Sequence, residues 1–169
     1  GGGIVIDHAV FPGRSGNAGA LGSLPIAIGN SGTGQLLDEV SLASLEITLL
    51  QQGIDPSPIW ITPDGWTTFG GVLDQWIEDS AGHLARAALA CCSVIDFQAI
   101  IIDGAFPADV RARLVEKPNA ALETLNIQGL HRPDILAGDI GNDARSLGAA
   151  TLPIFNRYLI DQNVLFSGS

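Results

Sequence analysis

The stretch Asp96–Pro107, DFQAIIIDGAFP, constrains the fold of this chain more than any other. Within it, Phe97–Ile102 is almost unbroken apolar and β-branched sequence, and it ends at Asp103-Gly104. Because alternate side chains of a strand point to opposite faces, three adjacent isoleucines predict a strand that is covered on both faces. Pro107 stands where a helix can begin, since proline is pre-organised for a first helical turn. Strand, glycine turn and helix in this order form the joint at which open α/β sheets usually bind ligands, although this stretch alone does not prove a site.

Composition bounds the class of protein. At 169 residues the chain is one domain, or one lobe of a larger one, with enough length for a core. Hydrophobic residues make up 46% against 15% charged, which argues against disorder. The net charge of −10 argues against direct contact with nucleic acid or an anionic membrane, because both would repel the chain. DNA binding through a further segment is compatible with this charge.

The cysteines and the apolar runs indicate a compartment. Cys91 and Cys92 are adjacent in a helix-like stretch, so no disulfide framework can form, which fits a reducing cytoplasm. No apolar run approaches the roughly 20 residues of a membrane span. The opening GGGIVID has neither the basic flank nor the length of a signal peptide, and it reads as a chain that starts within a motif. We therefore expect a cytoplasmic protein that does not associate with membranes.

The first third of the chain alternates between short apolar runs and glycine clusters. It predicts strands over Gly3–Asp7, Val10-Phe11 and Leu24–Ile28, a glycine loop over Gly13–Gly22, and a flexible polar turn over Gly29–Gly34. The glycines of the loop recur every three residues, and they allow the backbone to approach another group closely.

Helical periodicity dominates the remainder. We expect helices over Gln35–Gln52 with a stop at Gly53, from a cap at Thr67 or Thr68 through Cys92, from Pro107 with an interruption at Pro118, and from Asn142 or Asp143 to about Ile160. The long helix should bury a stripe formed by Leu73, Ile77, Leu84, Ala88 and Cys91. Ile54–Asp64, with three prolines, reads as a loop, and Ile135–Ala137 as a second buried strand. A strand meander followed by alternating elements predicts an α/β fold, a mixed sheet with helices on its faces.

The glycine loop, GRSGNAGALGS from Gly13 to Ser23, has two interpretations. In the first it is a ligand loop, in which Asn17 and Ser23 hydrogen-bond to hydroxyl groups while Gly16 and Gly19 let the ligand come close. In the second it is a structural turn whose glycines serve the backbone alone, because glycine loops are common. The residues of the loop leave both open.

Other candidates for chemistry are weaker. His8, His83 and His131 are scattered without the spacing of a metal site, so we expect ordinary structural roles for them. The three tryptophans could form a platform for a sugar ring, but their positions favour core or lid packing. No Gly-x-Ser-x-Gly sequence is present to position a nucleophilic serine.

Four motifs in order resemble the ROK family of bacterial repressors and sugar kinases. A GxxGxAGxxGxxP pattern begins at Gly13, and it is followed by GQLLDEVSLASLE (Gly34–Glu46), IIIDGAFP (Ile100–Pro107) and GNDARSLGAA (Gly141–Ala150). The resemblance covers nearly the whole chain. It implies that residues 1–169 form a single C-terminal lobe with the ribonuclease H-like, actin-like ATPase fold.

The chain departs from the family pattern at three sites. Family kinases carry AGExGH, whose glutamate and histidine hold sugar hydroxyls, and here Ala20 and Ser23 occupy those positions. The resemblance places Ile28, Asn30 and Gln35 where many members have zinc-binding cysteines, so we expect no metal. The nucleotide-binding Gly-Gly becomes Asp103-Gly104, a degenerate turn at which a carboxylate would meet a nucleotide with like charge or bulk.

The resemblance and these departures together lead to a regulatory interpretation. The chain resembles the effector-binding and oligomerising lobe of a ROK-type transcriptional repressor that senses a sugar or sugar derivative. DNA would be bound only through a domain outside this chain. The implied protein is a homo-oligomer without a cofactor, and we do not expect it to be an enzyme, because the catalytic aspartate of family kinases belongs to the preceding lobe. The alternatives are the C-terminal lobe of an ATP-dependent sugar kinase and a structural dimerisation lobe.

Overall fold

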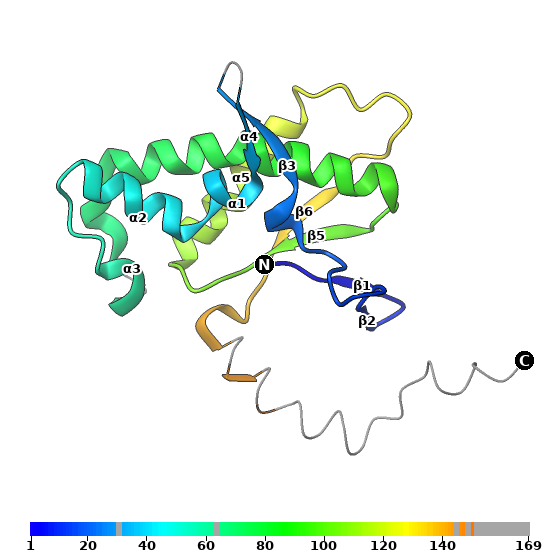
Figure 1. Cartoon of the computed structure of the whole chain (residues 1–169), viewed down its shortest axis with the longest axis horizontal. Coiled ribbons are helices and arrows are strands. Elements are labelled where there is room, and N and C mark those ends of the chain that lie inside the picture. The colour runs from blue at the N-terminus through cyan, green and yellow to red at the C-terminus, as the bar shows by residue number, and fades with distance from the viewer. Residues whose placement is uncertain (30–31, 63–64, 144–145, 148–149, 151–169) are drawn as a thin grey trace, which may run out of the picture.

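The structure is a computed structural model that describes residues 1–29, 32–62, 65–143, 146–147 and 150 (Figure 1). Its strands are β1 (Ile4–Ile6), β2 (Ala9–Phe11), β3 (Pro25–Ile28), β4 (Gly32–Gln35), β5 (Ala99–Ile102) and β6 (Asp134–Ala137). Its α-helices are α1 (Leu36–Val40), α2 (Leu42–Gln51), α3 (Pro58–Ile61), α4 (Gly70–Val94) and α5 (Ala108–Leu122). Three short 3-10 helices are η1 (Leu21–Ser23), η2 (Trp66–Phe69) and η3 (Gly141–Asp143).

Helix α4 is the longest helix of the described residues, and α1, α2, α5 and η2 pack against it (Figure 1). The expected buried stripe is confirmed at Leu73, Ile77 and Ala88. At its end Cys92 is buried instead of the expected Cys91. The expected cap at Thr67 or Thr68 is wrong, because both threonines lie in η2 and no side chain caps the start of α4.

Two apolar clusters form the core. The larger one joins η2 and the first half of α4 to α2, α3 and α5, and consists of Leu45, Leu49, Ile59, Trp66, Phe69, Leu73, Trp76, Ile77, Val110 and Leu114. The smaller one joins the second half of α4 to α5 and β6, and consists of Ala85, Ala88, Leu122 and Ile135. Burial of apolar surface in both clusters is the main force that holds the lobe together.

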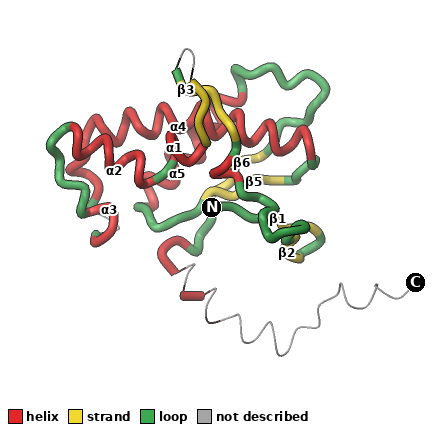
Figure 2. The backbone as a smooth tube through the Cα atoms, in the orientation of Figure 1, coloured by secondary structure: helices red, strands yellow, loops and turns green. Residues whose placement is uncertain are grey.

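The described strands form three separate pairs (Figure 2). β1 and β2 confirm the two strands expected there, and they pair as an antiparallel hairpin whose turn residues Asp7 and His8 both have positive φ angles, 50° and 66°. β3 pairs with β4, so the expected flexible turn over Gly29–Gly34 is wrong in its second half. Gly34 fits this strand because the side chain of Ile28 occupies the space that a Cβ would need.

The pair β5–β6 is parallel, with Ile100 opposite Ile135. The expectation that the β5 strand is covered on both faces is wrong for the described residues, because the side chain of Ile101 is 67% exposed. Helices cover the other face, where Ile100 and Ile102 lie against the smaller cluster. Half-buried Ile100 and Ile102 on one face and exposed Ile101 on the other follow directly from the strand geometry.

The helix expected over Gln35–Gln52 is divided at Ser41. Ser41 is extended and its hydroxyl accepts a hydrogen bond from the amide of Ser44, so it ends α1 and caps α2. The stop at Gly53 is confirmed: Gly53 has a φ of 70°, and the Ile54 amide reaches back to the Leu49 carbonyl.

Proline positions account for two further differences. The loop expected over Ile54–Asp64 contains helix α3, which Pro58 starts at its first turn. Pro118 lies buried inside α5 without interrupting it. One residue later, the Asn119 side chain donates to the carbonyls of Val115 (3.0 Å) and Ile135 (2.8 Å), which ties α5 to β6 across the proline.

The helix expected from Asn142 or Asp143 to about Ile160 lies mostly outside the described residues; Gly141–Asp143 itself forms η3. Among the helices of the described part, none combines the length and the apolar character needed to cross a membrane.

Candidate functional site

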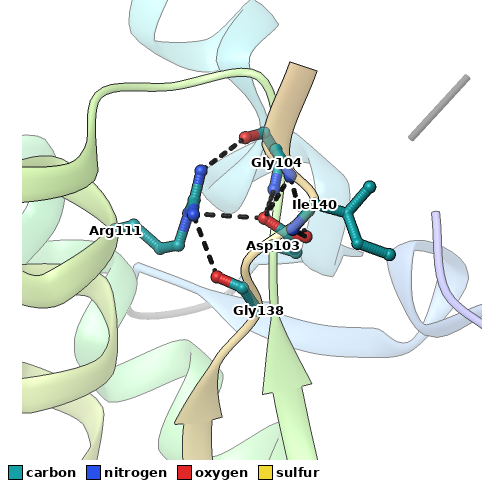
Figure 3. A network of polar contacts seen from close by, with 6 residues as sticks. Asp103, Gly104, Arg111, Gly138 and Ile140 are labelled. Carbon is teal, nitrogen blue, oxygen red and sulfur yellow. Dashed lines mark hydrogen bonds and ion pairs between the residues drawn. The ribbon is translucent and has the colours of Figure 1, made fainter. Parts of the chain in front are cut away.

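The candidate site lies where the parallel strands β5 and β6 both end. Asp103 and Gly104 follow β5, and Gly138 follows β6, so the two turns meet at one edge (Figure 3). The Gly138 amide continues the ladder by donating to the Ile102 carbonyl at 2.8 Å. Carboxyl ends of parallel strands are the usual place for ligands in α/β folds.

The carboxylate of Asp103 is held by three backbone amides. The Gly104 amide donates to Oδ1 at 2.8 Å, and the Ile140 amide donates to Oδ2 at 3.1 Å. The Gly141 amide lies 3.2 Å from Oδ1 and 3.1 Å from Oδ2 and is shared between them. The carboxylate thus points across to the turn after β6 and joins it to the end of β5.

Arg111 of α5 completes this arrangement. Its Nε lies 3.3 Å from Asp103 Oδ1, an ion pair, and its Nη1 donates to the Gly138 carbonyl at 2.9 Å. Nη2 lies 3.5 Å from the Gly104 carbonyl, and the guanidinium lies 5.9 Å from the centre of the Phe106 ring. The side chains of Arg111 and Asp103 are only 16% and 23% exposed, so water screens the pair less than it screens a surface ion pair.

Two glycines make room for this ion pair. A Cβ on Gly138 would lie 2.6 Å from the Cβ of Asp103, which is too close for any side chain. Gly141 has a φ of 58°, and a Cβ there would lie 2.8 Å from Arg111 Nη2. The turn after β6 therefore fits Asp103 and Arg111 only with glycine at both positions.

The surroundings of Asp103 shift its protonation equilibrium. Partial burial alone raises the pKa of the carboxyl, but the amides of Gly141, Gly104 and Ile140 and the charge of Arg111 outweigh that effect. The pKa of Asp103 is therefore lowered from its ordinary value, and the group is ionised at neutral pH.

The glycine loop follows β2 and ends in η1. Gly16 and Gly19 both have positive φ angles, 78° and 79°. Gly19 also packs backbone to backbone, since a Cβ on it would lie 2.7 Å from the Gly3 backbone. Asn17 and Ser23 are exposed, and the Asn17 amide nitrogen lies 3.3 Å from Ser15 Oγ. Their contact with a ligand stays a prediction.

Within the described ranges, no hydrogen bond or ion pair joins the glycine loop to the Asp103 turn. The positions compared with zinc-binding cysteines fall on the β3–β4 hairpin at Ile28 and Gln35, and Asn30 lies outside the described residues. Over the part of the chain that the structure describes, no group of three or more His, Cys, Asp or Glu side chains could hold a metal ion.

The sequence singled out Asp103 and Gly104 but missed Arg111, Gly138 and Gly141. A usable signal was present, because Gly138-Asp-Ile-Gly141 directly follows the second predicted strand of the α/β unit. Parallel strands end at the same edge, so that glycine pair had to face the turn after the first strand. No such signal was present for Arg111, since any polar residue near the start of α5 was equally suited to contact Asp103.

Comparison with known proteins identifies the fold that carries this site. No family model and no curated protein matches the chain. Among solved structures, a ROK family protein from Streptococcus pneumoniae TIGR4 in complex with sucrose matches with a TM-score of 0.64 and 16% identity over 87% of this chain and 52% of its own. The lobe has the ROK fold. This actin-like ATPase fold confirms the α/β class expected from the sequence.

Two further solved structures agree. ROK hexokinase from Thermus thermophilus has a TM-score of 0.60 and 19% identity over 88% of this chain and 51% of its own. A putative sugar kinase from Cytophaga hutchinsonii ATCC 33406 has a TM-score of 0.61 and 18% identity over 90% and 53%. The chain spans about half the length of these three solved structures, which corresponds to one lobe.

Proposed function

We propose that this chain is the C-terminal lobe of a two-lobed ROK-type sugar kinase, in which the sugar binds beside the glycine loop. The observation that supports this most is the likeness over 87–90% of the chain to three ROK-like structures, one described as a hexokinase, one as a putative sugar kinase and one in complex with sucrose. The regulatory role is the second candidate.

The geometry of Asp103 removes one objection to a kinase. A carboxylate at the nucleotide turn would repel a nucleotide if its charge were free. Here Arg111 and three amides neutralise that charge from within the lobe. The turn therefore presents little net charge to a nucleotide that approaches its outer side.

In this proposal Asn17 and Ser23 contact sugar hydroxyls, and Gly16 and Gly19 allow the sugar to come close. Both polar side chains are exposed, and among the described residues neither hydrogen-bonds to another part of the lobe. Asparagine and serine both donate and accept hydrogen bonds, which suits a hydroxyl group. The catalytic base would come from the complementary lobe of the complete protein.

The test is phosphoryl transfer by the complete protein. It should consume ATP in the presence of one member of a hexose and amino-sugar panel, and Asn17→Ala should raise the KM for that sugar with a smaller effect on kcat. Asn126→Ala serves as a control, because Asn126 is an exposed asparagine in the loop after α5. If no sugar stimulates ATP consumption while a sugar binds in calorimetry, the kinase proposal fails and sugar binding survives.

The second candidate is the effector lobe of an oligomeric sugar-responsive repressor. It is favoured by Ala20 and Ser23, which stand where the resemblance places the glutamate and histidine of family kinases. A sugar would then need different affinities for the DNA-binding and released states. Operator affinity that changes with sugar, without ATP turnover, would support this candidate, and a monomeric mass in solution would count against it.

A further inference from the structure

We propose that the turn around Asp103 is an oxyanion-binding site that the chain fills with its own carboxylate. The inference goes beyond the proposed function and does not depend on it. Removal of the carboxylate should convert the turn into a site for a small carboxylate or phosphate ion.

The donors around Asp103 are those that bind free oxyanions. The amides of Gly104, Ile140 and Gly141 converge on the two carboxylate oxygens at 2.8–3.2 Å, and Arg111 supplies a positive charge 3.3 Å from one of them. Converging backbone amides form nests that bind anions, and a guanidinium strengthens hydrogen bonds to carboxylate and phosphate. Figure 3 shows these donors directed at one point from three segments of the chain.

Two glycines leave room for the space that the Asp103 carboxylate occupies. Side chains at Gly138 and Gly141 would enter it, at 2.6 Å from Asp103 Cβ and 2.8 Å from Arg111 Nη2. Arg111 is also fixed independently of Asp103, because it donates to the Gly138 carbonyl and lies beside the Phe106 ring. Arg111 should therefore keep its position when the carboxylate is removed.

The wild-type chain should reject external anions. The Asp103 carboxylate is attached next to its own donors, so its effective concentration is far above that of any free ion. Asp103→Gly removes a group equivalent to acetate and restores a Gly-Gly sequence. Acetate is thus the matching probe, and inorganic phosphate tests whether the site accepts a tetrahedral oxyanion.

The experiment is chemical rescue of thermal stability in the full chain at pH 7. Asp103→Gly should melt below the wild type in sodium chloride. Replacement of chloride by acetate at equal ionic strength should raise its melting temperature saturably, by about 3–6 °C when acetate reaches ten times its dissociation constant. The wild type should show no such rise.

Two variants make the result specific. Asp109→Asn removes an exposed carboxylate from the first turn of α5 and so controls for net charge; it should not respond to acetate. Asp103→Gly combined with Arg111→Gln should lose the rescue, because the positive charge beside the site is gone. Asp103→Ser, which leaves a smaller cavity, provides a second background if the glycine variant does not fold in chloride. If neither background responds to acetate or phosphate differently from chloride, the proposal is overturned.

Discussion

The indole nitrogen of Trp76 donates a 3.1 Å hydrogen bond to Ser44 Oγ, which fastens α4 to α2. The same hydroxyl lies within hydrogen-bonding distance of the carbonyls of Ser41 (2.7 Å) and Glu39 (2.9 Å). Ser44 therefore connects the end of α1, the start of α2 and the first half of α4. All three helices thus share a polar contact at this hydroxyl.

Ser44→Ala should lower the free energy of unfolding by about 1–3 kcal/mol, because the largely buried Trp76 N–H loses its acceptor. Urea unfolding followed by tryptophan fluorescence measures the change. Ser93→Ala is the matched control, since that serine is exposed and bonds only within its own helix; it should change stability by less than about 0.5 kcal/mol. Equal losses in the two variants would contradict the role of the Trp76 contact.

Leu49 and Leu50 are adjacent on α2 but differ fully in burial, at 0% and 59% exposed. Leu49→Ala should cost about 2–5 kcal/mol, because it leaves a cavity in the larger core cluster. Leu50→Ala should cost well under about 1 kcal/mol. Both values come from denaturant unfolding, and a similar cost for the two leucines would contradict the orientation of α2.

Gly16 and Gly19 share a positive φ angle but differ in their surroundings. A Cβ on Gly16 meets nothing within 4 Å, whereas one on Gly19 strikes the Gly3 backbone. Gly19→Ala should therefore add about 1–3 kcal/mol of overpacking to the backbone strain that both variants share. Amide hydrogen exchange in β1 and β2 should be faster in Gly19→Ala than in Gly16→Ala. Equal exchange in both would show that Gly3 does not rest on the loop.

The pH dependence of stability should reveal the Asp103 contacts. Because the folded pKa of Asp103 is lowered, its stabilising contribution is complete above the unfolded pKa of about 4, and it is lost as the pH falls through the folded value. The stability difference between wild type and Asp103→Asn should thus be constant near neutral pH and shrink below about pH 4. Urea unfolding from pH 3 to pH 7 measures it. A difference that grows on acidification would contradict the assignment.

The sequence correctly predicted those elements that depend on neighbouring residues alone. The β-branched run before Asp103, the apolar stripe of α4 and the stop at Gly53 each come from residues that specify their own backbone conformation. It failed where the decisive contact lies in another element. β4 is a strand that pairs with β3, and Pro118 stays helical beside an asparagine that bonds to β6.

The candidate site was half predicted for the same reason. Asp103-Gly104 stood out as a turn after a strand, but its meaning depended on partners 7 to 38 positions away in the chain. When its contacts are unknown, a carboxylate at this position indicates a negatively charged surface. The same carboxylate among three amides and an arginine indicates a neutralised, internal contact.

The β1–β2 hairpin has a practical consequence. Its side chains at Val5, Val10 and Phe11 are exposed, and neither core cluster contains a residue that precedes Leu42. An isolated two-stranded hairpin is barely stable in water. Deletion of residues 1–12 should consequently leave the melting temperature of the helical part unchanged. It should also make the purified protein less prone to aggregate.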